Sequence, residues 1–219
     1  GRSIALSQDV RRDRRSTRAD GFTLVEILVV VLLIGIISAM AVPQTRAWTA
    51  AYRLKGDAQR INNLVGLAKM RAAARYSRSR VHVNLANNSF WLETWRRPVV
   101  GPPAVAGAWI QEGPTVTTQP GVTFGLAGVA VPPPNTQAAI AQSPACTDDA
   151  GAAIANSACI TFSSRGLPWT NVVPTAGGAL FPDSGLYLTD GSTVYGTTVT
   201  ATPLIKMWWA RANIANNAQ

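Results

Sequence analysis

The feature that most constrains this chain is a run of 21 mostly apolar residues, from Phe22 to Val42, which contains one carboxylate, Glu26. A helix of this length measures about 30 Å at 1.5 Å per residue, which matches the hydrocarbon core of a bilayer. Six arginines precede the run, and the positive-inside rule places them in the cytoplasm. We predict a transmembrane helix over residues 22–42, preceded by a cytoplasmic leader over residues 1–21 and followed by an exported part.

An amphipathic helix over residues 43–80 is expected to continue the membrane segment, with Pro43 at the point where the helix leaves the membrane. Its apolar side chains recur in steps of three and four, which places them on one face. These side chains belong to Leu54, Ala58, Ile61, Val65, Ala68 and Ala72. We expect this face to pack on a β-sheet, so that one long helix forms the spine of the protein.

The pattern changes to a period of two after Arg80, which is typical of β-strands. Residues 81–86 and 90–95 lie on either side of Asn87-Asn88, a turn signal, and predict a β-hairpin. Further strands are predicted at residues 108–111, 122–126, 158–163, 185–189, 193–195 and 199–205. We therefore predict an α+β fold in which the long helix packs on an antiparallel β-sheet domain of residues 81–219.

The charge and the two cysteines of the exported domain indicate a nearly neutral domain with one disulfide. The net charge of +9 is unevenly distributed, and residues 81–219 hold five basic against six acidic residues, so the domain itself is nearly neutral. Cys146 and Cys159 close a short loop, which suits a disulfide in an oxidising compartment such as the periplasm, with two free thiols as the alternative. Such a disulfide contributes about 3 kcal/mol in the chain-entropy treatment.

Glu26 is unusual because a charge in hydrocarbon costs about 2.5–3.5 kcal/mol even on the lenient insertion scale. It therefore needs a partner. A protease that cuts between Gly21 and Phe22 would create a new amino group near membrane depth. The Glu26 carboxylate of a neighbouring subunit could pair with this amine as the helices stack, and an unpaired charge in the bundle would be penalised.

The segment Gly21-Phe22-Thr23-Leu24-Val25-Glu26, followed by an apolar helix and Pro43, resembles the type IV pilins and type II secretion pseudopilins. In that class a prepilin peptidase removes the leader after the glycine, here Gly21, and methylates the new amino terminus, here Phe22. The glutamate, here Glu26, directs subunit docking. Residues 63–72 and 160–168 also resemble the GspH/FimT family of minor pilins and pseudopilins.

These resemblances imply a type IV pilin-like fold and a minor subunit that assembles near the tip of a type IV pilus or a secretion pseudopilus. The implied partners are prepilin peptidase, other pilin or pseudopilin subunits, the inner-membrane assembly platform and inner-membrane lipid. The implied location is the bacterial inner membrane, crossed once, with the globular domain in the periplasm, and afterwards the filament. No cofactor is implied.

Two alternatives remain open. Ala39-Met40-Ala41 satisfies the cleavage pattern of a secretory signal peptide, although the run is longer than usual and contains Glu26. A DNA-binding minor pilin for DNA uptake is the second alternative, because arginines and lysines cluster on residues 46–80 and could contact phosphates. Lys206, Arg211 and the adjacent pair Trp208-Trp209 are further candidates for that role.

An enzyme is not expected. His82 is the single histidine, and we expect it on an exposed strand face, where it would be structural or solvated. Two cysteines and one distant histidine do not have the spacing of a zinc site, so no metal site is predicted. Asp148-Asp149 could bind a cation, but a polar loop is the favoured interpretation.

Overall fold

The structure is a computed structural model that describes residues 21–126, 140–171, 177–181 and 183–211, with the side chains of residues 40–47 left out. Residues 1–20 of the predicted leader lie outside the described residues. The chain divides into two compact units, residues 1–45 and 46–219, which are described separately.

The helix α1 runs from Leu24 to Ala74. Thr23 caps its amino end, because its hydroxyl accepts a hydrogen bond from the Glu26 amide at 3.2 Å. At the carboxyl end Tyr76 takes a positive φ of 47°, and the Ser77 amide donates back to the Ala72 carbonyl. The helix therefore ends six residues before the predicted limit at residue 80, because this left-handed turn redirects the chain into the first strand.

The amino-terminal unit carries exposed apolar side chains along α1 from Leu24 to Ile37. Within the residues that the structure describes, no helix is both long enough and apolar enough to cross a membrane, and the span predicted for residues 22–42 is therefore not confirmed.

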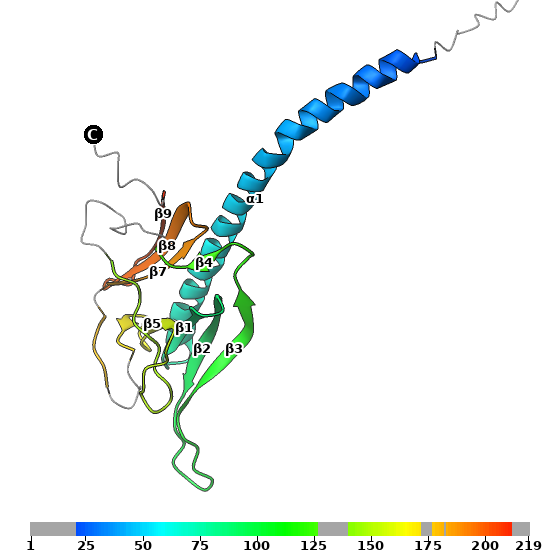
Figure 1. Cartoon of the computed structure of the whole chain (residues 1–219). Helices are drawn as coiled ribbons and strands as arrows, with labels where there is room; N and C mark the ends of the chain where they lie inside the picture. The colour runs from blue at the N-terminus through cyan, green and yellow to red at the C-terminus, as the bar shows by residue number, and fades with distance from the viewer. Residues whose placement is uncertain (1–20, 127–139, 172–176, 182, 212–219) are drawn as a thin grey trace, which may run out of the picture. The chain divides into compact units, whose positions relative to one another are not determined.

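The first sheet of the second unit is antiparallel and has the order β3-β2-β1-β5-β6. Its strands are β1 (Ser79–Asn84), β2 (Ser89–Arg96), β3 (Ala108–Thr117), β5 (Ser157–Phe162) and β6 (Pro168–Trp169). The predicted hairpin is confirmed, since β1 pairs with β2 and Asn88 in the turn has a φ of 52°. Figure 1 shows this sheet beside the carboxyl half of α1.

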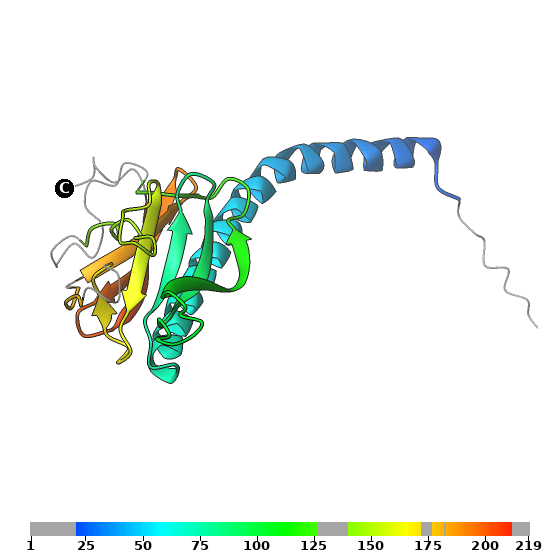
Figure 2. The same cartoon turned by 90° about the horizontal axis from the view of Figure 1, so that it is seen from below.

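The second sheet is also antiparallel, with the order β4-β7-β8-β9. Its strands are β4 (Thr123–Phe124), β7 (Asp183–Thr189), β8 (Thr193–Thr200) and β9 (Ile205–Arg211). The strand predicted at residues 199–205 is wrong, because residues 201–204 form the turn between β8 and β9. Figure 2 shows yellow β5 between the green and cyan strands of the first sheet and the orange strands of the second.

The core lies between α1 and both sheets. All six residues of the predicted helix face are at most 2% exposed, which confirms the periodicity argument. They meet inward-pointing side chains of the first sheet, such as Val81 and Ile160, and of the second sheet, such as Leu186. The predicted α+β class is therefore confirmed, and a helix packed on antiparallel sheets is consistent with a pilin-like fold.

Candidate functional site

The amino-terminal segment is sterically open. Gly21 and Phe22 precede the helix, the Phe22 side chain is 77% exposed, and a Cβ added at Gly21 would meet no atom within 4 Å. A peptidase can therefore reach the bond between these two residues without displacing any described part of the chain.

Glu26 occupies the third position of α1, where its amide is held by the Thr23 cap. A negative charge in the first turn of a helix is stabilised by the helix dipole, so the local structure tolerates the carboxylate. The side chain is exposed and has no ion-pair partner among the described residues. It is thus available to a cation that the described residues do not supply.

Comparison with protein families identifies this segment. Residues 16–42 match the family model described as the prokaryotic N-terminal methylation motif. This motif is typical of the amino terminus of type IV prepilin-like proteins, and here it covers 27 of the 219 residues. The motif supports a type IV pilin or pseudopilin that is processed by prepilin peptidase and assembles with other pilin subunits. No curated protein and no solved structure is significantly similar to the chain.

The match leaves the individual roles of this prepilin-like segment as predictions. Cleavage between Gly21 and Phe22, methylation of Phe22 and docking through Glu26 all fall within the matched residues, but no observation tests them one by one. The finer assignment to the GspH/FimT family also stays a prediction.

A second polar cluster lies on the face of the first sheet that points away from α1. Arg80 on β1 and Glu93 on β2 are register partners, and both side chains are buried. Arg80 Nε donates to Glu93 Oε2 at 2.5 Å, and Trp91 Nε1 donates to Glu93 Oε1 at 2.7 Å. The Arg80 guanidinium also stacks 3.9 Å from the Trp109 ring centroid. The pair is therefore a buried, hydrogen-bonded ion pair.

Opposing effects set the protonation of this pair. Burial alone would raise the pKa of Glu93, but the adjacent His82, the charge of Arg80 and the hydrogen bonds from Arg80 and Trp91 outweigh it and lower the pKa from 4.5 to about 2. Burial lowers the pKa of Arg80, and the Glu93 carboxylate acts in the opposite direction. Glu93 is therefore ionised at neutral pH.

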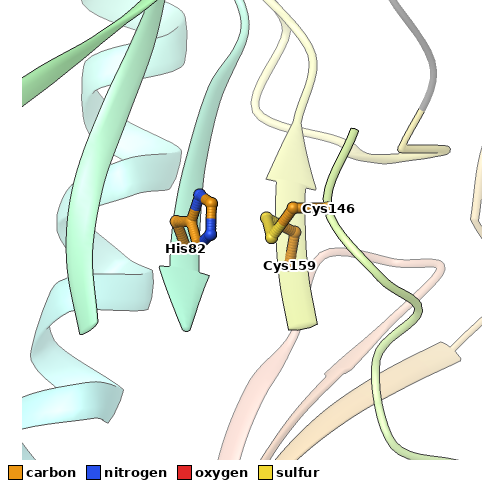
Figure 3. Close-up of side chains that lie close together, drawn as sticks. All are labelled: His82, Cys146 and Cys159. Carbon is orange, nitrogen blue, oxygen red and sulfur yellow. A yellow bond between two sulfur atoms is a disulfide. The ribbon is translucent and has the colours of Figure 1, made fainter. Parts of the chain in front are cut away.

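His82 is buried beside this pair, so the prediction of an exposed histidine is wrong. Its ring stacks on Trp91 with centroids 4.3 Å apart, and its Nδ1 lies 3.2 Å from Glu93 Oε1. It is also the register partner of Cys159 and lies next to the predicted Cys146–Cys159 disulfide, which the structure contains. Figure 3 shows the imidazole beside the two sulfur atoms.

The histidine that appears distant in sequence thus comes close to both cysteines, with ligand atoms within 4.8 Å of one another. A metal would need the cysteines as thiolates, and both sulfurs are joined to each other instead. While the disulfide is formed, His82 packs beside Cys146 and Cys159 and the two sulfurs are not available as metal ligands.

The outer sheet face is buried because residues 143–154, the covering segment, cross over it. The disulfide fixes this segment to β5, and the Thr147 carbonyl accepts a hydrogen bond from Arg80 Nη1 at 2.7 Å. The side-chain amide of Asn171 donates to the carbonyls of Pro144, Ala145 and Cys159. These links hold the covering segment on the outer sheet face, so that the segment covers this face in place of solvent.

The two acids of the covering segment have structural roles. Asp148 Oδ1 accepts hydrogen bonds from the amides of Ala150 and Ala152, and Asp149 Oδ1 accepts one from the Trp109 amide. These bonds build a local turn and tie it to β3. They favour the polar-loop interpretation over cation binding.

Several basic residues proposed for DNA contact are engaged within the protein. Arg60 pairs with Asp57 at 3.2 Å, and Arg71 and Arg75 both pair with Glu112. Lys69 Nζ donates to the Pro203 carbonyl. These contacts reduce the charge that the helix offers to phosphates, and the DNA alternative stays a prediction.

The tryptophan pair lies on β9, with its members on opposite faces. Trp208 packs over Gly196 and lies 5.4 Å from the Tyr187 ring, whereas Trp209 is 59% exposed. Trp209 is thus the member that is available to another subunit.

The Arg80–Glu93 pair is not among the residues predicted from the sequence. A signal was present, because the predicted turn at Asn87-Asn88 fixes a hairpin register that places these opposite charges across from each other. Their burial was not visible, since it depends on the covering segment, which follows more than 45 residues later in the chain.

Proposed function

We propose that this protein is a minor pilin or pseudopilin that is held in the bacterial inner membrane by residues 22–42 and is then incorporated into a filament near its tip. The observation that carries the proposal is the methylation motif over residues 16–42, placed directly at the start of a 51-residue helix. The apolar side chains exposed between Leu24 and Ile37 support a lipid or helix-bundle environment for this segment.

Processing supplies the partner for Glu26. Prepilin peptidase cleaves after Gly21 on the cytoplasmic side and leaves Phe22 with a free amino group, which the same enzyme methylates. The Glu26 carboxylate of an incoming subunit pairs with the Phe22 amine of its neighbour inside the helix bundle. Because an unpaired charge is costly in a low-dielectric bundle, this contact sets the axial register between subunits.

The minor-subunit assignment rests on the resemblance of residues 63–72 and 160–168 to the GspH/FimT family. A second unit as large as residues 46–219 suits a rare subunit that stands at a filament end, where neighbours crowd it least. The assembly platform of the inner membrane is the proposed site of incorporation.

The decisive experiment replaces Glu26 with alanine. We expect Glu26→Ala protein to be processed and to remain in the membrane fraction but to be lost from sheared filaments, at least tenfold below wild type by immunoblot. Glu112→Ala, which removes a carboxylate from the second unit, serves as the matched control and should be incorporated normally. Normal incorporation of Glu26→Ala would defeat the docking role, and a mature amino terminus other than Phe22 would defeat the processing role.

A further inference from the structure

A groove of about 790 Å³ opens where α1 ends, between the turn at Tyr76, the end of β2 and the turn that joins β5 to β6. A second groove of about 420 Å³ adjoins it and shares Ser77, Trp95 and Arg97. Together they form one elongated depression, which we call the distal groove. It lies about 40 Å along the helix axis from Trp48, near the other end of the helix within this unit.

The rim of the distal groove is strongly basic. Arginines converge on it from three parts of the chain, and the rim residues are Arg75, Arg78, Arg96, Arg97 and Arg165. The acidic residue of the lining is Glu112, which already pairs with Arg71 and Arg75. Arginines therefore outnumber acidic residues in the described lining, while Arg78 and Arg97 also donate hydrogen bonds to the carbonyls of Gly177 and Tyr76.

The floor of the same groove is apolar. Trp95, Leu167 and Leu180 line it, and the Leu180 side chain is 51% exposed. The hydroxyl of Ser163 also lines it, and this buried oxygen has no hydrogen-bond partner within the described part of the chain. A buried hydroxyl without a partner costs free energy, which a ligand with a carbonyl or carboxylate oxygen would recover.

We propose that the distal groove binds an acidic peptide segment of a different protein, one in which carboxylates alternate with apolar side chains. Apolar anchors of the peptide occupy the floor, and its carboxylates form charge-assisted, bidentate hydrogen bonds with the guanidinium groups of the rim. Ser163 donates to an oxygen of the bound segment. This binding would be separate from assembly through the helix.

Two observations select this occupant. A second copy of this chain is disfavoured because the chain stays basic after removal of residues 1–21, with 14 basic against eight acidic residues. A nucleic-acid strand would use the arginines, but it would leave Leu167 and Leu180 facing a polar backbone. A peptide that presents both acidic and apolar side chains can contact the basic rim and the apolar floor at the same time.

The test measures fluorescence anisotropy with the purified full chain in mild detergent. The probe is a labelled peptide of alternating glutamate and leucine, and detergent alone is the blank. We expect saturable binding that weakens as salt rises. A glutamate–serine peptide should bind about tenfold more weakly, and a lysine–leucine peptide should not bind.

Paired variants locate the site. Arg97→Gln with Arg165→Gln should weaken binding of the glutamate–leucine peptide about tenfold. Arg53→Gln with Arg211→Gln removes the same two charges elsewhere and should change it less than about twofold. Equal losses in both pairs, or no saturable peptide binding by the wild type, would overturn the proposal. So would a single-stranded oligonucleotide that binds more tightly than the peptide, since it would assign the groove to nucleic acid.

Discussion

Replacement of Glu93 by glutamine tests whether the buried ion pair stabilises the fold. The change keeps the shape of the side chain but removes the carboxylate that contacts the Arg80 guanidinium, which is 2% exposed, and leaves Asp149 as the remaining negative charge acting on it. Removal of one partner of a buried pair costs about 3–5 kcal/mol. The lowering of the Glu93 pKa from 4.5 to about 2 gives a similar value, about 3 kcal/mol at about 1.4 kcal/mol for each tenfold change in proton affinity.

The same pKa predicts how this stabilisation depends on pH. A carboxyl whose pKa is lower in the folded than in the unfolded state stabilises the fold at every pH above its unfolded value. For Glu93 the full contribution is present above about pH 4.5 and is lost as pH falls to about 2. The difference between wild type and Glu93→Gln should therefore be about 3 kcal/mol at pH 7 and should decrease steadily below pH 4.5.

Urea unfolding of the purified full chain, followed by tryptophan fluorescence at several pH values, measures this difference. Glu112→Gln is the matched control, because its arginine partners are about half exposed and such a pair contributes less than about 1 kcal/mol. Arg80→Met combined with Glu93→Leu should be more stable than either single variant, since it removes both charges together. A Glu93→Gln effect below about 1 kcal/mol at pH 7, or one that does not change with pH, would refute the reasoning.

Two further predictions concern the covering segment and the second sheet. Replacement of Cys146 and Cys159 by serine should lower the free energy of unfolding by about 3 kcal/mol, and reduction of the wild type should reproduce the loss; an unchanged unfolding midpoint would contradict this. Gly196→Ala would place a Cβ 2.4 Å from Cζ2 of Trp208 and should lower the free energy of unfolding by about 1–3 kcal/mol. The control is Gly56→Ala on α1, whose added Cβ meets nothing within 4 Å and should leave the free energy of unfolding unchanged or raise it. Urea unfolding measures both.

Local patterns in the sequence predicted the parts of the fold that depend on near neighbours. The buried face of α1 follows from the helical period alone, and the hairpin of β1 and β2 follows from alternation around Asn87-Asn88. The end of α1 is harder to predict from the sequence, because Tyr76 adopts a left-handed conformation that is uncommon for a residue other than glycine, asparagine or aspartate. The boundary between β8 and β9 was misplaced because Val199 and Ile205 are both apolar and flank a short turn.

The amino-terminal motif could be predicted from the sequence because its six residues are contiguous. The role of Glu26 follows from the free-energy cost of one charge in an apolar segment. The distal groove is not evident from the sequence, since Arg78, Arg97 and Arg165 become neighbours only after the first sheet has formed beside the end of the helix. Taken along the sequence, residues 81–219 are nearly neutral, and this average hides the local surplus of positive charge. A charge average over a domain is thus a poor guide to where a folded surface concentrates charge.

The covering segment links the stability of the unit to the surfaces left for partners. It occupies the outer face of the first sheet, so Arg80, His82 and Glu93 are unavailable to any partner while it stays in place. The Cys146–Cys159 disulfide and the bond from Arg80 to the Thr147 carbonyl hold this same segment, and links that share one element are not expected to contribute independently. Because this face is closed, the surfaces of the second unit that remain open to a partner include the distal groove and the exposed side of Trp209.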